Sequence, residues 1–163
     1  MDLVKQVEKQ YGHRLRLRVC GICIENEKLL LVHHKGVGPE GELWSPPGGG
    51  MEYGSTAPDN LKREFLEETG LVVAVEEQIF VHEYLEPPLH AFEIFYIVKV
   101  MGGTLYTGYD PESEREAQLI QHVSFISWEE IKQKPPAHLH QILKHSSSLQ
   151  DLLCRRGYYK FSV

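Results

Sequence analysis

Three glutamates on one predicted helix, directly after a run of glycines, constrain this chain more than any other feature. Gly48–Gly50 form the glycine run, and Glu64, Glu67 and Glu68 follow on the helix. Positions three and four apart lie on one face of a helix. Three carboxylates in one place repel one another unless a cation lies between them. Mg²⁺ prefers oxygen ligands and commonly binds together with phosphate. The residues indicate a metal site for phosphate chemistry, although an isolated acidic pattern would be typical of a solvated helix face.

The same stretch resembles the Nudix box, Gly-x5-Glu-x7-Arg-Glu-U-x-Glu-Glu-x-Gly-U, in which U is a bulky aliphatic residue. In this chain the pattern begins at Gly49, and its later fixed positions are Arg63, Glu64, Phe65, Glu67, Glu68, Gly70 and Leu71. Two positions depart from it: Phe65 is aromatic, and the first glutamate is replaced by Ser55. The resemblance covers roughly residues 14–145. It implies a Nudix-type α/β/α sandwich with a mixed central sheet, which suits one domain over residues 1–163 with a helical and aromatic tail at 146–163.

The resemblance also implies roles for the residues of the box. Glu64 and Glu68 would be the main metal ligands, Glu67 would support them or bridge a second ion, and the backbone carbonyl of Gly48 would complete the site. The ion would be Mg²⁺, with Mn²⁺ as an alternative. In the family, the glutamate replaced here by Ser55 usually pairs with the arginine that matches Arg63. Arg63 must therefore find another partner, for which Glu52 is a candidate.

The general base cannot be assigned in the same way. Nudix enzymes often draw a base or an extra metal ligand from a loop after the central strands, where this chain has Glu112, Glu114 and Glu116. These three are candidates, but a solvent-exposed charge run is the simpler interpretation for any one of them. Trp44, Tyr53, Phe80 and Tyr84 are candidates to stack on a base, although most large aromatic residues belong to the core.

Local patterns predict most of the elements. Alternation over residues 14–24 indicates a half-buried strand with Leu15, Leu17 and Val19 on its apolar face. Further strands are expected at residues 28–34, 71–84, 91–101 and 123–126. The box helix should begin after Thr56 and end at Gly70. A second helix should open at residue 127, and a helical tail should span residues 138–153. Cys20 and Cys23 lie three apart in a strand, which places them on opposite faces and favours buried thiols over a metal site.

Composition limits the class of protein. The net charge of −6 and the isoelectric point near 5.8 argue against a nucleic-acid-binding surface. No run approaches the ~20 apolar residues of a membrane span, and no leader-like segment opens the chain. We therefore expect a cytoplasmic protein with a small-molecule nucleotide substrate, no nucleic-acid partner and no membrane. A homodimer is expected only by analogy with relatives.

The predicted reaction is Mg²⁺-dependent hydrolysis of a diphosphate bond in a nucleoside diphosphate linked to another group. Pro87 falls sixteen residues after Leu71, which resembles the signature of ADP-ribose pyrophosphatases and favours ADP-ribose or another sugar nucleotide. A simple turn at Pro87-Pro88 is the alternative. A nucleoside triphosphate substrate is the first rival hypothesis. The second is a non-catalytic nucleotide sensor, which the loss of the glutamate at Ser55 keeps open.

Overall fold

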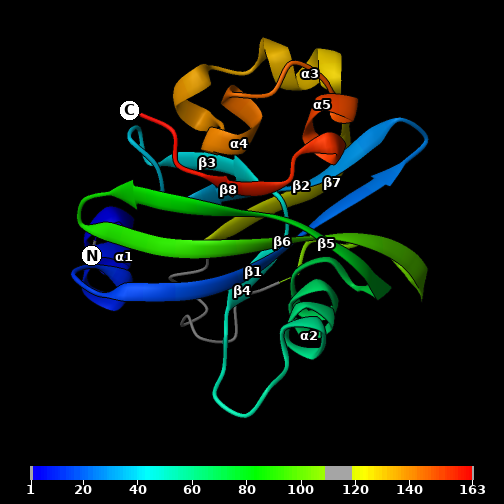
Figure 1. Cartoon of the computed structure of the whole chain (residues 1–163). Coiled ribbons are helices and arrows are strands. Elements are labelled where there is room, and N and C mark those ends of the chain that lie inside the picture. Colours follow the sequence, from blue (N-terminus) through cyan, green and yellow to red (C-terminus); the bar gives the residue numbers. More distant parts are fainter. Residues whose placement is uncertain (1, 109–118, 163) are drawn as a thin grey trace.

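The computed structural model describes residues 2–108 and 119–162 (Figure 1). The base candidates Glu112, Glu114 and Glu116 lie outside these residues. In chain order the elements are α1 (Leu3–Tyr11), β1 (Leu15–Glu25), β2 (Lys28–Lys35), β3 (Glu42–Ser45), β4 (Gly48–Gly50), α2 (Ala57–Thr69), β5 (Leu71–Glu86), β6 (Leu89–Gly103), β7 (Ile120–Ser127), α3 (Trp128–Gln133), the 3₁₀ turn η2 (Pro136–His138), α4 (Gln141–Lys144), α5 (Leu149–Cys154) and β8 (Gly157–Tyr159).

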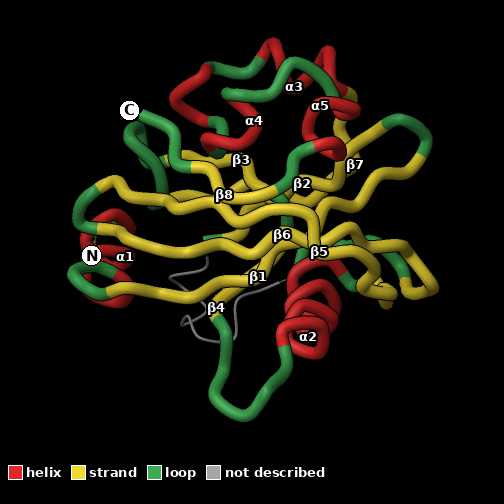
Figure 2. Tube along the Cα trace, in the orientation of Figure 1, coloured by secondary structure: helices red, strands yellow, loops and turns green. Residues whose placement is uncertain are grey.

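The described strands form one mixed sheet with helices on both faces. Its order is β3-β2-β1-β6-β5-β8, with β4 paired to β1 and β7 paired to β2. The β1–β6 and β5–β8 pairs are parallel and the others antiparallel. Helix α2 lies on one side of the sheet, and α3, α4 and α5 lie on the other (Figures 1 and 2). The predicted α/β/α sandwich with a mixed sheet is confirmed.

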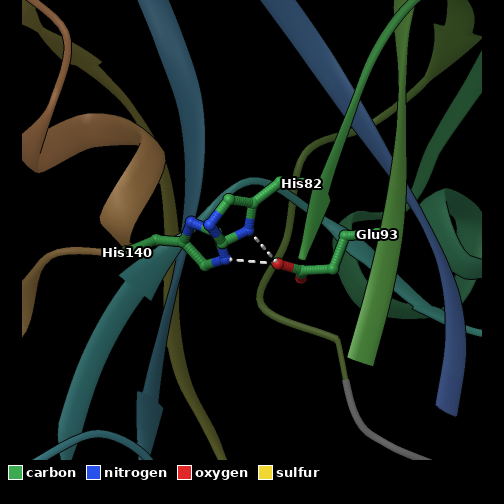
Figure 3. Close-up of side chains that lie close together, drawn as sticks. All are labelled: His82, Glu93 and His140. Carbon is green, nitrogen blue, oxygen red and sulfur yellow. Dashed lines mark hydrogen bonds and ion pairs between the residues drawn. The ribbon is translucent and has the colours of Figure 1, made fainter. Parts of the chain in front are cut away.

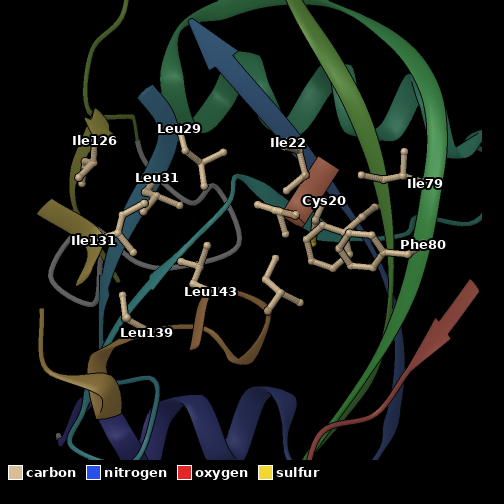
Figure 4. Packing of buried hydrophobic residues seen from close by; sticks show 13 residues of the cluster. Cys20, Ile22, Leu29, Leu31, Ile79, Phe80, Ile126, Ile131, Leu139 and Leu143 are labelled. Atoms are coloured by element: carbon tan, nitrogen blue, oxygen red, sulfur yellow. The ribbon is translucent and has the colours of Figure 1, made fainter. Parts of the chain in front are cut away.

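Each layer of helices has its own apolar core. On the α2 side, Leu61 and Phe65 pack with Val19 and Cys23 of β1. On the other side, side chains of the C-terminal helices pack with Cys20 and with residues of β2, β5 and β6 (Figure 4). The two cysteines therefore face opposite layers and are buried, as predicted. None of the helices in residues 2–108 and 119–162 is long and apolar enough to cross a membrane.

Helix α2 has the boundaries that its sequence predicts. The Thr56 hydroxyl accepts a hydrogen bond from the Asp59 backbone N–H at 3.2 Å, which caps the first turn. Gly70 ends the helix with φ of 75°, a left-handed conformation that favours glycine. The helix packs very closely on β1: a Cβ on Gly21 would lie 2.5 Å from the Phe65 ring. Glycine at position 21 thus sets the distance between α2 and the sheet.

Two expectations about the elements are wrong. On the predicted apolar face of β1, Val19 is fully buried under α2, but Leu15 and Leu17 are 63% and 48% exposed. The opposite face, with Arg16 and Arg18, lines an interior pocket. The C-terminal tail is not one helix over residues 138–153 but a 3₁₀ turn and two short helices. Ser148 caps α5 through its hydroxyl, and serine side chains that bind nearby backbone groups compete with helix continuation.

Candidate active site

Arg63 holds two of the three box glutamates in place. Its guanidinium donates to Glu64 Oε1 and to Glu67 Oε2, both at 2.9 Å. The Glu67 contact joins residues four apart on the same helix face. A third carboxylate, Glu52, lies 3.4 Å from Arg63. The expected partner for Arg63 is therefore present, and it comes from the loop before the helix.

Glu64 lies directly against the glycine strand β4. A Cβ on Gly49 would come within 2.3 Å of the Glu64 carboxylate, so only glycine allows this approach. The carboxylate is largely buried, at 13% exposure. Burial raises the pKa of Glu64 to about 7, and Arg63, which favours the ionised form, does not offset this. The site therefore contains a buried carboxylate that a divalent cation would stabilise.

Glu68 joins the helix to the other end of β4. Its Oε2 accepts a hydrogen bond from the Gly48 backbone N–H at 3.1 Å, and the residue is 8% exposed. Gly48 itself pairs with Cys20 of β1 in antiparallel register. Gly48, Glu64, Glu67 and Glu68 thus line one pocket together with Gly49 and Gly50.

The loop between β4 and α2 is held by Asn60, a residue that sequence reasoning missed. The Asn60 amide donates to the Gly50 carbonyl at 3.1 Å and accepts from the Glu52 backbone N–H at 3.0 Å. Asn60 is completely buried. The Ser55 hydroxyl, by contrast, donates to the neighbouring Thr56 carbonyl, and the Ser55 backbone N–H donates to the Glu52 carbonyl. Asn60, through its bonds to the loop backbone, and Glu52, through its contact with Arg63, therefore take the place of the glutamate that is missing at Ser55.

The pocket continues from the glutamates to a second polar cluster. Its wall includes Arg18 and Cys20 of β1, Glu93 of β6 and His140 at the start of α4. The sheet register aligns Arg18 with Glu93 and Glu93 with His82 of β5, so that three strands contribute to one row. His82 and His140 both contact Glu93 Oε1, at 3.0 and 2.8 Å (Figure 3).

Glu93 is ionised in this cluster. Burial opposes its ionisation, but His140, His82 and Arg18 hold the pKa of Glu93 well below its usual range. The ligand atoms of His82, Glu93 and His140 all lie within 4.8 Å of one another, a spacing that would suit a metal ion. Each side chain is buried. The cluster is therefore either a metal site or a hydrogen-bonded charge network.

The second cluster escaped the sequence analysis because its members are far apart in the chain. His82 and Glu93 are separated by 11 residues, and Glu93 and His140 by 47. A signal was present, since Glu93 interrupts an apolar run in a strand that is otherwise buried at alternate positions. A charged residue at an inward position needs a partner or a ligand.

The aromatic candidates have different surroundings. Tyr84 lines the pocket. Trp44 stacks on His33, with ring centroids 4.6 Å apart, and Phe80 is a core residue stacked on Phe95. Tyr53 is fully exposed. Pro87 lies in the turn between β5 and β6, and among the described residues it is not part of this pocket wall.

Comparisons with known proteins agree with the fold and the box. The sequence model of the NUDIX domain family matches residues 14–145. The ADP-ribose pyrophosphatase of Methanocaldococcus jannaschii is 35% identical over 94 residues, which cover 56% of this chain and 55% of that protein. The chain therefore spans about half the length of this curated relative.

Solved structures share the fold at low sequence identity. The crystal structure of an ADP-ribose pyrophosphatase from Streptococcus suis 89-1591 has a TM-score of 0.60 at 20% identity, covering 88% of this chain and 98% of that one. A MutT NUDIX hydrolase from Burkholderia pseudomallei has a TM-score of 0.61 at 17% identity, covering 85% and 96%. Since the family match spans most of its residues, the chain belongs to the NUDIX domain family of hydrolases.

Proposed function

We propose that this chain is a metal-dependent hydrolase that cleaves a diphosphate bond in a nucleoside diphosphate linked to another group. ADP-ribose or another sugar nucleotide is the favoured substrate class. The observation that carries the proposal is the position of Glu64, Glu67 and Glu68 in one pocket wall, against the glycine strand β4. Carboxylates grouped beside a glycine strand suit a metal–phosphate complex.

The box residues offer oxygen ligands of the kind that a divalent cation takes, although among the described residues only His82, Glu93 and His140 form a group of three whose ligand atoms lie within 4.8 Å of one another. Glu64, Glu67, Glu68 and the backbone carbonyl of Gly48 would hold Mg²⁺ or Mn²⁺, both of which accept oxygen ligands. The raised pKa of Glu64, about 7, supports this assignment, because a nearby cation favours the carboxylate over the protonated form. When bound, such an ion supplies charge neutralisation at phosphate oxygens and lowers the pKa of a coordinated water.

The chain's own residues orient these groups. Arg63 fixes the carboxylates of Glu64 and Glu67 through its two 2.9 Å contacts. The glycines of β4 allow this arrangement, because a Cβ on Gly49 would collide with the Glu64 carboxylate and a Cβ on Gly48 with the backbone of β1. The general base stays a prediction: Glu112, Glu114 and Glu116 are candidates, and Glu64 could itself help to orient the water.

Two observations favour a sugar nucleotide over a nucleoside triphosphate. The relative from Methanocaldococcus jannaschii carries the name ADP-ribose pyrophosphatase. The lining of the pocket also continues from the glutamates to Arg18, Glu93 and His140, which could contact a group beyond the diphosphate. Pro87 adds little, since it lies in a hairpin turn. A triphosphate would instead yield a nucleoside monophosphate and pyrophosphate.

A substrate panel tests the proposal. ADP-ribose, sugar nucleotides, dinucleoside polyphosphates and nucleoside triphosphates are incubated with Mg²⁺ or Mn²⁺, and the products are separated by chromatography. We expect a nucleoside monophosphate plus a phosphorylated remainder from at least one diphosphate substrate. Glu68→Gln should lower kcat about 100-fold, because it removes a charged ligand. The exposed Glu76→Gln serves as the matched control and should retain wild-type activity.

The rival functions predict different results. Turnover of triphosphates alone would favour the pyrophosphohydrolase hypothesis. Tight binding of one nucleotide without turnover of any would support the non-catalytic sensor. Full activity in Glu68→Gln would contradict the metal assignment. The homodimer and the cytoplasmic location stay predictions, which light scattering and cell fractionation can test.

A further inference from the structure

A row of charged side chains crosses the sheet in the pocket wall, and it begins next to the glycine strand, where Arg18 is the register partner of Gly50. Arg18, Glu93 and His82 are register partners on β1, β6 and β5. Glu93 Oε1 contacts both histidines of the cluster, as Figure 3 shows. Glu93 Oε2 accepts a long contact from the Cys20 thiol at 3.8 Å and lies 3.8 Å from Arg18 Nε. One oxygen of Glu93 is thus fixed by two rings, and the other faces β1.

The directions of the hydrogen bonds determine where the protons lie. The Ile142 backbone N–H donates to His140 Nδ1 at 3.2 Å, so the proton of a neutral His140 ring is on Nε2, facing Glu93. His82 contacts Glu93 Oε1 through Nδ1 and Gln141 Oε1 through Nε2. The orientation of the Gln141 amide is set by its donation to Glu86 at 2.8 Å. Both His82 nitrogens therefore face acceptor oxygens.

This proton arrangement disfavours a metal ion in the second cluster. An ion would need the lone pairs of His82 Nδ1 and His140 Nε2, the two nitrogens that face Glu93. At His140 the lone pair is on Nδ1, where Ile142 donates. The contacts of Gln141 with His82 and of Ile142 with His140 therefore favour a hydrogen-bonded network, in which the two histidines orient the Glu93 carboxylate.

The network ends at an unfilled hydrogen-bond position in the pocket. Arg18 Nε is buried and has no hydrogen-bond partner among the residues that the structure describes. Both Arg18 and Glu93 line the same pocket as the box glutamates. The pocket wall also includes the apolar and aromatic side chains of Leu43, Tyr84 and Phe95. Such a wall suits a flat heterocycle better than a sugar, which carries hydroxyl groups around its ring.

We propose that Arg18 and Glu93 recognise the base of the nucleotide substrate, with Arg18 donating to an acceptor on the base edge and Glu93 Oε2 accepting from an adjacent N–H. His82 and His140 are positioning residues that hold the Glu93 carboxylate. The inference rests on the proposed function in that the pocket binds a nucleotide. The inference adds to that function the two residues, Arg18 and Glu93, that form hydrogen bonds with the base.

Binding of product-like ligands tests the inference without requiring turnover. Dissociation constants of AMP, GMP, UMP and ribose 5-phosphate are measured by calorimetry for the wild type and Glu93→Gln. We expect Glu93→Gln to weaken the preferred nucleotide about 10- to 100-fold, since a hydrogen bond to a charged group is lost. Ribose 5-phosphate has no base, so its affinity should change less than twofold. With an active substrate, KM should rise while kcat changes less than about threefold.

A second variant covers the case in which Glu93→Gln fails to fold. Arg18→Gln removes the other half of the site and should produce the same base-dependent loss of affinity. The matched control is Arg14→Gln, which changes an exposed arginine of the same segment and should leave all four affinities unchanged. For the positioning role, His140→Asn retains an N-cap side chain and should show a smaller, equally base-dependent loss.

The outcomes separate this inference from the proposed function. An equal loss for AMP and ribose 5-phosphate, or no loss for any nucleotide, would overturn the base-recognition site. Absence of hydrolysis with a base-dependent loss of binding would leave the site supported and the enzymatic function refuted.

Discussion

Asn60 stabilises the junction between the glycine strand and α2 from inside the helix. In the Nudix box, the position of Ser55, eight residues before Arg63, is usually a glutamate that pairs with this arginine. In this chain Asn60 bonds to the backbone of both Gly50 and Glu52, while the Glu52 carboxylate approaches Arg63. A neutral amide can both donate and accept, which a carboxylate cannot do. The loop is therefore held by backbone contacts as well as by charge.

Asn60→Ala tests this role. Two backbone groups, at Gly50 and Glu52, would lose their partner, and each costs about 1 kcal/mol or more when it stays partly buried. We expect the free energy of unfolding to fall by about 2–3 kcal/mol in urea denaturation. The exposed Lys62→Ala on the same helix is the control and should change it by less than about 0.5 kcal/mol. An Asn60→Ala variant as stable as the control would show that the loop does not depend on the amide.

His34 gives the protein a pH dependence of stability. Burial and the nearby Arg18 lower the pKa of His34 to about 3, from 6.5 in an unfolded chain. Between these values the unfolded chain binds a proton that the folded protein does not, so stability rises with pH from about 3 to 6.5. We expect His34→Gln to reduce the slope of unfolding free energy against pH in this window, by at most about 1.4 kcal/mol per pH unit. An unchanged slope in urea titrations at pH 4.5, 5.5 and 6.5 would contradict this assignment.

At the scale of elements, some features were predictable and others were not. The limits of α2 follow from Thr56 and Gly70, which are local signals. The inward face of β1 was not predictable from alternation, because alternation shows that two faces differ and not which of them faces inward. Here the interior contains a charged pocket, so Arg18 faces inward and Leu17 outward. Apolar patterning fails where the interior is built for a polar ligand.

The close packing of α2 on β1 gives a prediction at this scale. Gly21→Ala would place a Cβ 2.5 Å from the Phe65 ring and 3.1 Å from Val98, so that the helix or the strand must move. We expect a loss of about 1–3 kcal/mol in unfolding free energy, as for other overpacked cores. Gly102→Ala in β6 is the matched control, because nothing lies within 4 Å of its Cβ. It should be neutral, and equal effects of the two substitutions would show that packing against Phe65 is not the cause.

The pocket combines two groups of residues, the box glutamates and the Arg18, Glu93 and His140 group. The two groups differ in whether the sequence alone reveals them. The box half is continuous in sequence, so its spacing alone predicts Glu64, Glu67 and Glu68 as metal ligands. The second half needs the parallel pairing of β1 with β6 and the return of the chain to α4, so that Arg18, Glu93 and His140 meet. Contacts between distant segments depend on topology, which local patterns do not contain. The reaction class was thus predictable from sequence, while the residues that read the substrate were not.

The C-terminal segment packs against His82, which holds the Glu93 carboxylate. Strand β8 pairs in parallel with β5, so that Tyr159 is the register partner of His82. Beyond it, Phe161 stacks on His145 at 4.3 Å between ring centroids and on His82 at 5.6 Å. Tyr159 and Phe161 lie after the end of the family match at residue 145. The chain therefore uses a segment outside the matched region to cover the buried His82 ring.

Phe161→Ala tests whether the fold and the pocket depend on this cover. Loss of a half-buried ring should lower the unfolding free energy by about 2 kcal/mol. Hydrogen exchange should speed up in β5 around His82, because water gains access to the strand that β8 protects. Nucleotide affinity should also fall, since His82 holds the Glu93 carboxylate. The exposed Lys160→Ala should change none of these quantities. Faster exchange in β5 with unchanged affinity would place the segment in the core but not in the site.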